Sequence, residues 1–407
     1  MSAPESSPRR RKIPRNVWAL SGTSFFNDIS SEMILNLLPL FLANVLGAGT
    51  AVIGLIEGVA ESTASLLKVY FGGLSDRLGA RKPLAVGGYL LSTLAKPVFF
   101  FAGSWGVVAG ARWADRVGKG VRTAPRDALI ADSISSNNRG LAFGLHRAAD
   151  TGGAVLGLLI AIAVVWYMQG GTPELGRETF QTLVLVSLVP ALLAVAFVAL
   201  GVREIRKGAA SDAPRIGFRG LGRRFTVFLV IVGLFDLGNF SDAFLVLRAQ
   251  ERGLGVDDVL WTLLGFNLVY ALVATPAGAL SDRIGRRRII TAGWIAYAGI
   301  YLGFALAGSG TQIVALYLCY GAYYGLTMGT AKAMVADLVP VRLRGTAYGS
   351  YHALVGIIDL PASLIAGLLW QGIGSWQGFG PAAPFYFGAA TALAAALFLT
   401  AFLRDAD

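Results

Sequence analysis

Residues 111–127, ARWADRVGKGVRTAPRD, place five basic and two acidic side chains in a segment that is otherwise suited to a membrane-spanning helix. At about 100° per residue, all seven charged groups fall on less than half of the helix circumference. Lipid cannot solvate such a face, so it must contact protein or a wet cavity. There it can bind a charged solute, move a proton or pair with acids of other helices. The seven residues are Arg112, Asp115, Arg116, Lys119, Arg122, Arg126 and Asp127.

We expect the function to lie on this charged face. The main alternative is a network of charges that only locks helices together. A phosphate-binding loop around Lys119 is excluded, because GxxxxGK[ST] would require glycine at Trp113 and Ser or Thr at Gly120.

Other apolar segments of the first half also carry charges at helical spacing. Glu57 and Glu61 lie on one face of segment 51–73, and Asp150 follows His146 by four residues. Across four such segments seven acids oppose seven bases. Because an unpaired charge in the bilayer is costly, most of these groups must pair, and acids will neutralise much of the basic face.

Asp28 and Glu32 share one face of segment 17–45. At about 1.5 Å per residue, they and the basic face of 111–127 all approach the middle of the membrane. We therefore predict that Asp28 and Glu32 face Arg112 and Arg116 and form a proton-coupling site.

The second half carries fewer intramembrane charges, and Asp242 in NFSDAF is its best candidate for a cavity residue, although a capping or packing role fits equally well. Aromatic residues are abundant in both halves and can line a site for an amphipathic organic molecule. The predicted proton-coupling and substrate-cavity residues are Asp28, Glu32, Glu57, Glu61, Arg112, Asp115, Arg116, Lys119, Asp150 and Asp242.

The composition indicates the elements that must position these residues. Of the 407 residues 55% are hydrophobic and 14% are charged, which predicts an all-α membrane protein. The 52 glycines suit close approach of helices in lipid. Twelve apolar segments predict twelve membrane-spanning helices, at 17–45, 51–73, 83–102, 105–131, 142–166, 180–200, 225–247, 259–280, 289–307, 312–335, 347–370 and 384–402.

The distribution of Lys and Arg outside these segments predicts the orientation. With the N-terminus cytoplasmic, 23 of these residues lie inside and 3 lie outside, which places both termini in the cytoplasm of a multi-pass protein in the inner or plasma membrane. The net charge of +11 thus reflects short basic loops and does not indicate nucleic-acid binding. The expected organisation is a tail (1–16), a six-helix bundle (17–201), a basic linker (202–224) and a second bundle (225–404).

The chain offers little for cofactor or metal chemistry. Cys319 is the only cysteine and there are two histidines, so neither a disulfide within the chain nor a cysteine metal site is possible. No nucleophile–base pair or nucleotide loop is present either. We expect no metal, no cofactor and no enzymatic activity.

The two halves are copies of each other. GGLSDRLGARK at 72–82 recurs as GALSDRIGRRR at 278–288, and Asp76 and Asp282 are 206 positions apart. ADSISSNNRGLAFG at 131–144 recurs as ADLVPVRLRGTAYG at 336–349, at a spacing of 205. Because the repeat falls after six helices, both halves cross the membrane in the same orientation.

The duplicated loop resembles the G-x-x-x-D-R-x-G-R-[RK] signature of the major facilitator superfamily of secondary transporters, and the resemblance covers essentially the whole chain. It implies two six-helix bundles that rock around a central cavity, with these loops forming a cytoplasmic gate. The residues that match the gate are Gly72, Asp76, Arg77, Gly79 and Arg81, then Gly278, Asp282, Arg283, Gly285 and Arg287.

Two further patterns resemble the proton-coupled drug exporters of this superfamily. Arg112, Gly118 and Gly120 fit R-x-x-x-G-x-G-x-G except that Arg116 replaces its first glycine, and Gly153 and Gly157 fit part of the second exporter motif. The resemblance implies proton-coupled export of a small, partly hydrophobic organic molecule, with protons and the bilayer as further partners and a monomer as the functional unit. The alternatives are a facilitator or importer of an organic anion, and a membrane enzyme or lipid-handling protein on the same fold.

Overall fold

The computed structural model describes residues 13–135, 138–205, 221–340 and 343–403, apart from the side chains at positions 275, 278, 279, 281 and 282. Within these ranges the chain is helical, and the one β-bridge is an isolated contact between Ile373 and Trp376. The all-α prediction is therefore confirmed.

Each predicted apolar segment coincides with one helix or with one broken helix. The first half contains α1 (Arg15–Leu35), α2 (Leu38–Leu40), a π-helical segment (Phe41–Val45), α3 (Thr50–Leu78), α4 (Lys82–Phe100), α5 (Trp105–Asp132), α6 (Arg139–Gln169), α7 (Arg177–Ala196) and a second π-helical segment (Phe197–Gly201). The second half contains α8 (Arg223–Leu237), α9 (Ala243–Glu251), α10 (Val256–Ile284), α11 (Arg286–Leu306), α12 (Gly310–Asp337), α13 (Arg344–Gln371) and α14 (Ala383–Phe402).

Eight helices of the described part are long and apolar enough to cross a membrane by length and composition alone. Helix α5 is not one of them, because every membrane-length stretch of it contains several charged residues. It lies against α3 and α4, which pack along it. The neighbouring helices therefore supply the environment that α5 needs within the bilayer.

The first helix of each half is interrupted. Helix α1 ends at Leu35, and the chain continues through α2, which contains Pro39. Helix α8 ends at Leu237, and α9 starts at Ala243. The carbonyl of Gly238, freed by this break, accepts a hydrogen bond from the Tyr297 hydroxyl at 3.1 Å. Such a break is tolerated at membrane depth because buried groups satisfy the exposed backbone.

The two halves repeat each other in their contacts as well as in sequence. The Arg81 side chain donates to the Ala128 carbonyl and pairs with Asp132. Arg286, 205 positions later, donates to the Ala333 carbonyl and pairs with Asp337, the residues 205 positions after Ala128 and Asp132.

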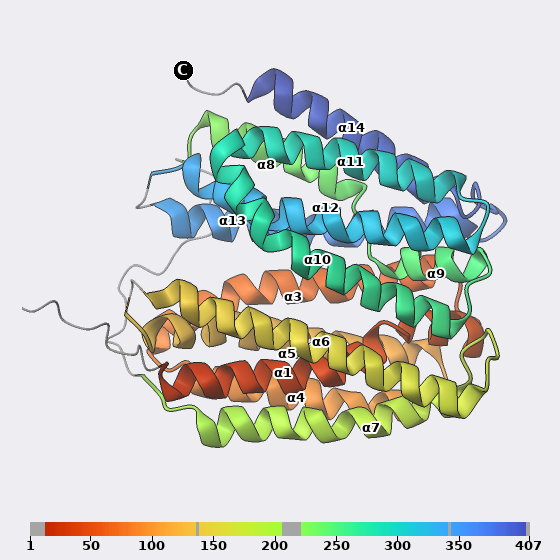
Figure 1. Cartoon of the computed structure of the whole chain (residues 1–407), viewed down its shortest axis with the longest axis horizontal. Coiled ribbons are helices and arrows are strands. Elements are labelled where there is room, and N and C mark those ends of the chain that lie inside the picture. The colour runs from red at the N-terminus through yellow and green to blue at the C-terminus, as the bar shows by residue number, and fades with distance from the viewer. Residues whose placement is uncertain (1–12, 136–137, 206–220, 341–342, 404–407) are drawn as a thin grey trace, which may run out of the picture.

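The halves meet mainly through two helix pairs, α3 with α13 and α6 with α10. Glycines bring α3 and α13 together: a Cβ at Gly54 would lie 2.2 Å from the Ser363 carbonyl oxygen. We call the end where α1 begins and α14 ends the linker end, and the opposite end the far end (Figure 1). At the far end Val256 N–H donates to the Pro173 carbonyl of the other half at 3.2 Å. Toward the linker end, α6 and α10 diverge (Figure 1).

Candidate functional site

A cavity of about 650 Å³ lies between the halves and is lined by both. Helices α1, α3, α5 and α6 form one wall, which we call the first wall. The α8–α9 connection, α9, α10, α12 and α13 form the second wall. The predicted cavity residues Asp28, Glu32, Glu57, Glu61, Arg112, Asp115, Arg116, Lys119, Asp150 and Asp242 all line this one cavity.

Six charged residues of α3 and α5 form the charge cluster of the first wall: Glu57, Glu61, Arg112, Asp115, Arg116 and Lys119. Arg112 binds Glu57 through two hydrogen bonds, Nε to Oε1 at 3.1 Å and Nη2 to Oε2 at 2.6 Å. Glu61 Oε1 lies 3.3 Å from Arg116 Nη2 and 3.5 Å from Arg112 Nη2. The cluster contains three acids and three bases, so its charges balance when all are ionised.

Exposure varies within this cluster. The side chains of Arg112 and Glu57 are each 5% exposed, whereas that of Lys119 is 45% exposed and its Nζ lies 3.9 Å from Glu61 Oε2. A guanidinium held by two hydrogen bonds to a buried carboxylate is a strong, geometrically fixed pair. Arg112 and Glu57 therefore form the rigid base of the cluster, and Lys119 and Glu61 are the members that a solute can reach.

Asp28 and Glu32 line the same cavity as Arg112 and Arg116, but among the described residues they form no ion pair with these arginines. Asp28 Oδ1 accepts a hydrogen bond from Asn27 at 3.0 Å, and Glu32 Oε2 accepts one from Asn36 at 2.6 Å. Among the described residues neither carboxylate belongs to an ion pair.

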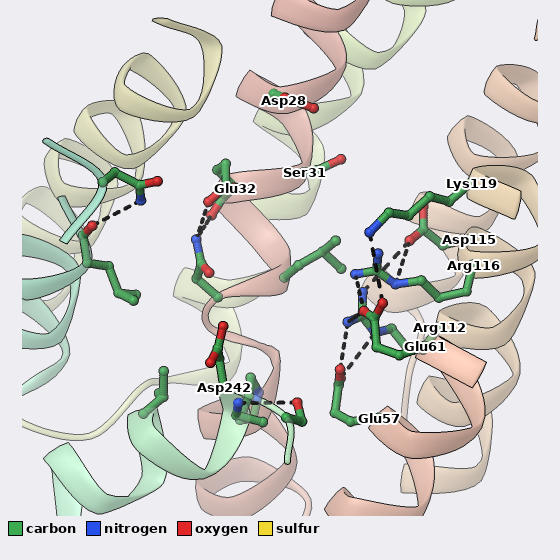
Figure 2. A pocket seen from close by; sticks show the side chains of 18 of the residues that line it. Asp28, Ser31, Glu32, Glu57, Glu61, Arg112, Asp115, Arg116, Lys119 and Asp242 are labelled. Atoms are coloured by element: carbon green, nitrogen blue, oxygen red, sulfur yellow. Dashed lines mark hydrogen bonds and ion pairs between the residues drawn. The ribbon is translucent and has the colours of Figure 1, made fainter. Parts of the chain in front are cut away.

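The packing of the helices explains this difference. Helix α3 lies directly against α5, where a Cβ at Gly120 would come 2.6 Å from Leu67 Cβ, so the acids of α3 reach the arginines first. Helix α1 instead packs on α6, where a Cβ at Gly153 would lie 2.3 Å from the Phe25 carbonyl oxygen. Figure 2 shows the charge cluster gathered on one side and Asp28 and Glu32 apart from it on α1.

Asp150 and His146 form the predicted pair on α6, with Nε2 and Oδ1 3.8 Å apart. Both ring nitrogens of His146 and Oδ1 of Asp150 are buried and have no hydrogen-bond partner in the described part of the chain. The next residue, Arg147, crosses to the other half, where its guanidinium bonds to the Tyr270 hydroxyl and lies 5.2 Å from the centre of the Tyr270 ring.

Asp242 is the acid of the second wall, at the point where α8 gives way to α9. It occupies the N-cap position of α9, but its side chain makes no capping hydrogen bond, which rules out the capping role considered from the sequence. Its Oδ1 instead accepts a hydrogen bond from the Tyr320 hydroxyl at 3.0 Å.

One buried cation near the first wall, Lys96, was missed by the sequence analysis, and the contacts of a second, Arg122, were not predicted. Lys96 of α4 is 2% exposed and donates to the hydroxyls of Ser30 and Ser31 on α1. Arg122, which the sequence placed only on the charged face, bonds to Ser92 and lies 4.6 Å from the centre of the Tyr89 ring. A single lysine within the apolar segment 83–102 was the signal for Lys96.

In the first half, Asp76 and Arg81 of the predicted gate belong to a network of contacts. Arg81 Nη2 lies 2.8 Å from Asp76 Oδ1, and the N–H groups of Arg81 and Lys82 donate to Glu204, at 2.8 Å from Lys82. Gly79 ends α3 in a left-handed conformation, φ 60°, which glycine adopts without strain. Arg77 is the basic residue of the last turn of α3, and Gly72 lies one turn earlier, where a Cβ would lie 3.2 Å from Ala124 Cβ.

The second copy of the gate is described in part. Gly285 has φ 100°, Arg283 lies in the last turn of α10, and the side chains of Gly278 and Asp282 lie outside the described residues. Arg287 donates to the Thr400 carbonyl at 3.3 Å, whereas Arg286 makes the contacts equivalent to those of Arg81. Arg286 therefore occupies the position equivalent to Arg81, because the extra residue Ala80 shifts the register between the two copies by one, and a gating role of Arg287 stays a prediction.

Comparison with known proteins agrees with this architecture. The family model of the Major Facilitator Superfamily matches residues 20–244 and again residues 225–407. The chain belongs to the major facilitator superfamily. An uncharacterised transporter of this superfamily from Methanocaldococcus jannaschii is 35% identical to it over 96% of this chain and 95% of the relative.

Other similar proteins are named for different solutes. A probable 4-methylmuconolactone transporter of Cupriavidus pinatubonensis is 24% identical over 90% of this chain and 86% of its own. The solved structure of the nucleoside transporter NupG matches with a TM-score of 0.76 at 13% identity, over 96% of this chain and 100% of that one, which shows a common fold. This major facilitator protein is a membrane transporter for small molecules and not an enzyme.

Proposed function

We propose that this transporter exports a small, partly hydrophobic organic molecule in exchange for protons. The observation that carries the proposal is the position of Asp28 and Glu32. Both line the cavity, and among the described residues both bind amides and belong to no ion pair. The acids of the charge cluster, by contrast, are already neutralised by arginine and lysine.

A proton changes the free energy of a carboxylate in the membrane most when that carboxylate has no cation partner. Within the bilayer an unpaired charge costs about 2.5–3.5 kcal/mol on the lenient insertion scale, so binding a proton removes a charge that the membrane disfavours. When the cavity is open to water, the same charge is solvated. Alternate exposure of Asp28 and Glu32 to the two sides can therefore couple a proton gradient to the movement of the bundles.

The second wall supports an organic substrate with apolar surface. Phe240, Phe266, Tyr317, Tyr320 and Tyr324 line it together with Leu263 and Val246. Apolar and aromatic linings with a few polar groups are typical of small-molecule sites.

Export is supported by the orientation that the Lys and Arg bias predicts. We propose that the linker end faces the cytoplasm. The two halves contact each other at the far end, through Pro173 and Val256 and through α2 and α9, so the cavity would load from the cytoplasm in this conformation.

Transport in proteoliposomes tests the proposal. A panel of organic compounds is first screened for uptake or release driven by a pH gradient. Asp28→Asn and Glu32→Gln are then compared with wild type in gradient-driven transport and in exchange without a gradient. We expect at least one substitution to abolish gradient-driven transport while exchange continues.

Glu178→Gln serves as the control, because Glu178 lies in the first turn of α7 and does not line the cavity. It should behave as wild type in both assays. If both cavity variants still concentrate substrate against its gradient, Asp28 and Glu32 are not the coupling groups.

A further inference from the structure

The two walls of the cavity differ in charge balance. Six acids line the first wall, and six bases line it as well: Asp28, Glu32, Glu57, Glu61, Asp115 and Asp150 against Arg112, Arg116, Lys119, Arg122, Arg126 and Arg147. Among the described residues of the second wall, two acids, Asp242 and Asp359, line the cavity, and no Lys or Arg does. Asp242 belongs to no ion pair among the described residues, so a substrate that lies against it meets a carboxylate without a competing protein cation.

Asp242 is held so that its carboxylate faces the cavity. It starts α9, where the helix dipole favours a negative charge, and its side chain is not used to cap the helix. The hydrogen bond from Tyr320 fixes one carboxylate oxygen of Asp242. Because Tyr320 is the donor, the carboxylate remains an acceptor, as a group that binds a cation must be. Figure 2 shows Asp242 separated from the arginines of the charge cluster.

Aromatic rings surround this carboxylate. The Tyr320 ring centre lies 5.6 Å from that of Phe266 and 5.3 Å from that of Tyr324. The Phe266 and Tyr320 rings are nearly parallel at 29°, whereas Tyr324 stands edge-on at 69° to Tyr320. Ring faces attract organic cations, and the attraction grows where water is excluded.

We infer that the substrate is an organic cation with apolar or aromatic substituents, and that its charge docks at Asp242 against Phe266, Tyr320 and Tyr324. The inference rests on the proposed function, because it names the substrate class of the same cavity. It assigns the substrate charge to the second wall and leaves Asp28 and Glu32 on the first wall for the proton.

Binding of two ions with the same shape and opposite charge tests this inference. Tetraphenylphosphonium and tetraphenylborate are titrated into the full transporter in detergent, without any gradient, and binding is followed by calorimetry. We expect the cation to bind and the anion not to bind. Asp242→Asn should weaken cation binding at least tenfold, and Tyr320→Phe should weaken it less, because the ring stays and only the hydrogen bond to Asp242 is lost.

Asp257→Asn is the matched control, since Asp257 lies on α10 of the same half but does not line the cavity. It should bind the cation as wild type does, which also corrects for uptake of the ion by detergent. Asp359→Asn provides a second test if Asp242→Asn does not fold, and it should weaken cation binding severalfold.

Three results overturn the inference. The first is binding of the anion but not the cation, and the second is binding of neither ion. The third is that Asp28→Asn or Glu32→Gln weakens cation binding while Asp242→Asn leaves it unchanged. Because binding is measured without a gradient, failure of proton coupling in the flux assay would leave this result intact, and the two proposals can fail separately.

Discussion

Arg112 and Glu57 show what a buried charge requires in this protein. Each side chain is 5% exposed and the two are joined by two hydrogen bonds. Removing Glu57 leaves Arg112 charged in the protein interior with only the longer contacts to Glu61 at 3.5 Å and Asp115 at 3.8 Å, and breaking a buried pair in this way costs about 3–5 kcal/mol. Removing both partners avoids most of that cost.

We therefore predict that Glu57→Gln lowers the free energy of unfolding by about 3–5 kcal/mol, and that the double variant Glu57→Gln with Arg112→Gln is more stable than Glu57→Gln alone. Thermal unfolding of the purified protein measures both. Asp127→Asn is the comparison, because Asp127 pairs with Arg126 at 2.9 Å but is 39% exposed, and a pair that water reaches contributes less than a fully buried one. An equal loss in Glu57→Gln and Asp127→Asn would contradict this account.

At the residue scale the sequence predicted which side chains share the cavity but not which of them pair. Helical spacing places Asp28 with Glu32 and Glu57 with Glu61, because side-chain direction repeats with the helix turn. Which acid reaches Arg112 depends on which helix packs against α5. The glycines between α3 and α5 and between α1 and α6 decide that choice, and periodicity within one helix carries no information about its neighbours.

At the element scale, glycines set how closely α4 and α5 approach. A Cβ at Gly118 of α5 would lie 2.5 Å from the Gly88 carbonyl oxygen of α4, so the two backbones touch. Gly118 is also part of the exporter-like pattern, and its role in this chain is to let the helices cross. The charged residues on either side, Asp115 and Arg122, owe their depth in the bundle to this contact.

Gly118→Val should therefore force α4 and α5 apart and destabilise the protein by about 1–3 kcal/mol or more. Gly110→Val on the same helix is the control, because nothing lies within 4 Å of a Cβ at Gly110. Thermal unfolding compares the two variants. If both lose the same stability, the intrinsic helix propensity of glycine and valine explains the effect, and the close crossing does not.

The breaks in the first helix of each half were outside what the sequence predicted. Segments 17–45 and 225–247 are continuous in hydropathy, and hydropathy does not report whether a helix stays straight. The break at Gly238 depends on contacts far along the chain, with Tyr297 and with α14. It places Asp242 on the cavity wall, and a single unbroken helix would not start a new N-terminus there.

The loop between α3 and α4 also acts at this scale. Arg81 joins Asp76 at the end of α3 to Asp132 at the end of α5, so the loop holds helices of one half together. Because α3 packs on α13 of the other half, we propose that this network transmits the movement of the bundle to the interface.

Asp76→Asn should slow transport at least severalfold while changing the free energy of unfolding by less than about 1 kcal/mol, because Asp76 is 31% exposed. Flux in proteoliposomes and thermal unfolding check the two parts, with Glu178→Gln as the control. Normal flux at normal expression would remove the gating role.

At the scale of the whole molecule, the proposed orientation places the linker end in the cytoplasm. In a Cys319→Ser background, Arg223→Cys reports the linker end and Glu174→Cys reports the far end, and both positions are exposed. With an impermeant maleimide added to intact cells, we expect Glu174→Cys to react and Arg223→Cys to react only after the cells are opened. Reaction of Arg223→Cys in intact cells would reverse the orientation and, with it, the proposed direction of loading.

The dependence of α5 on its neighbours has a consequence for how this protein is made. The ribosome delivers α3 before α5, so Glu57 and Glu61 reach the membrane before the arginines that neutralise them have been synthesised. Each lone charge costs about 2.5–3.5 kcal/mol at the centre of an inserted helix. Helix α3 is apolar enough to cross the membrane, so its two acids make insertion less favourable until α5 arrives and its arginines pair with them.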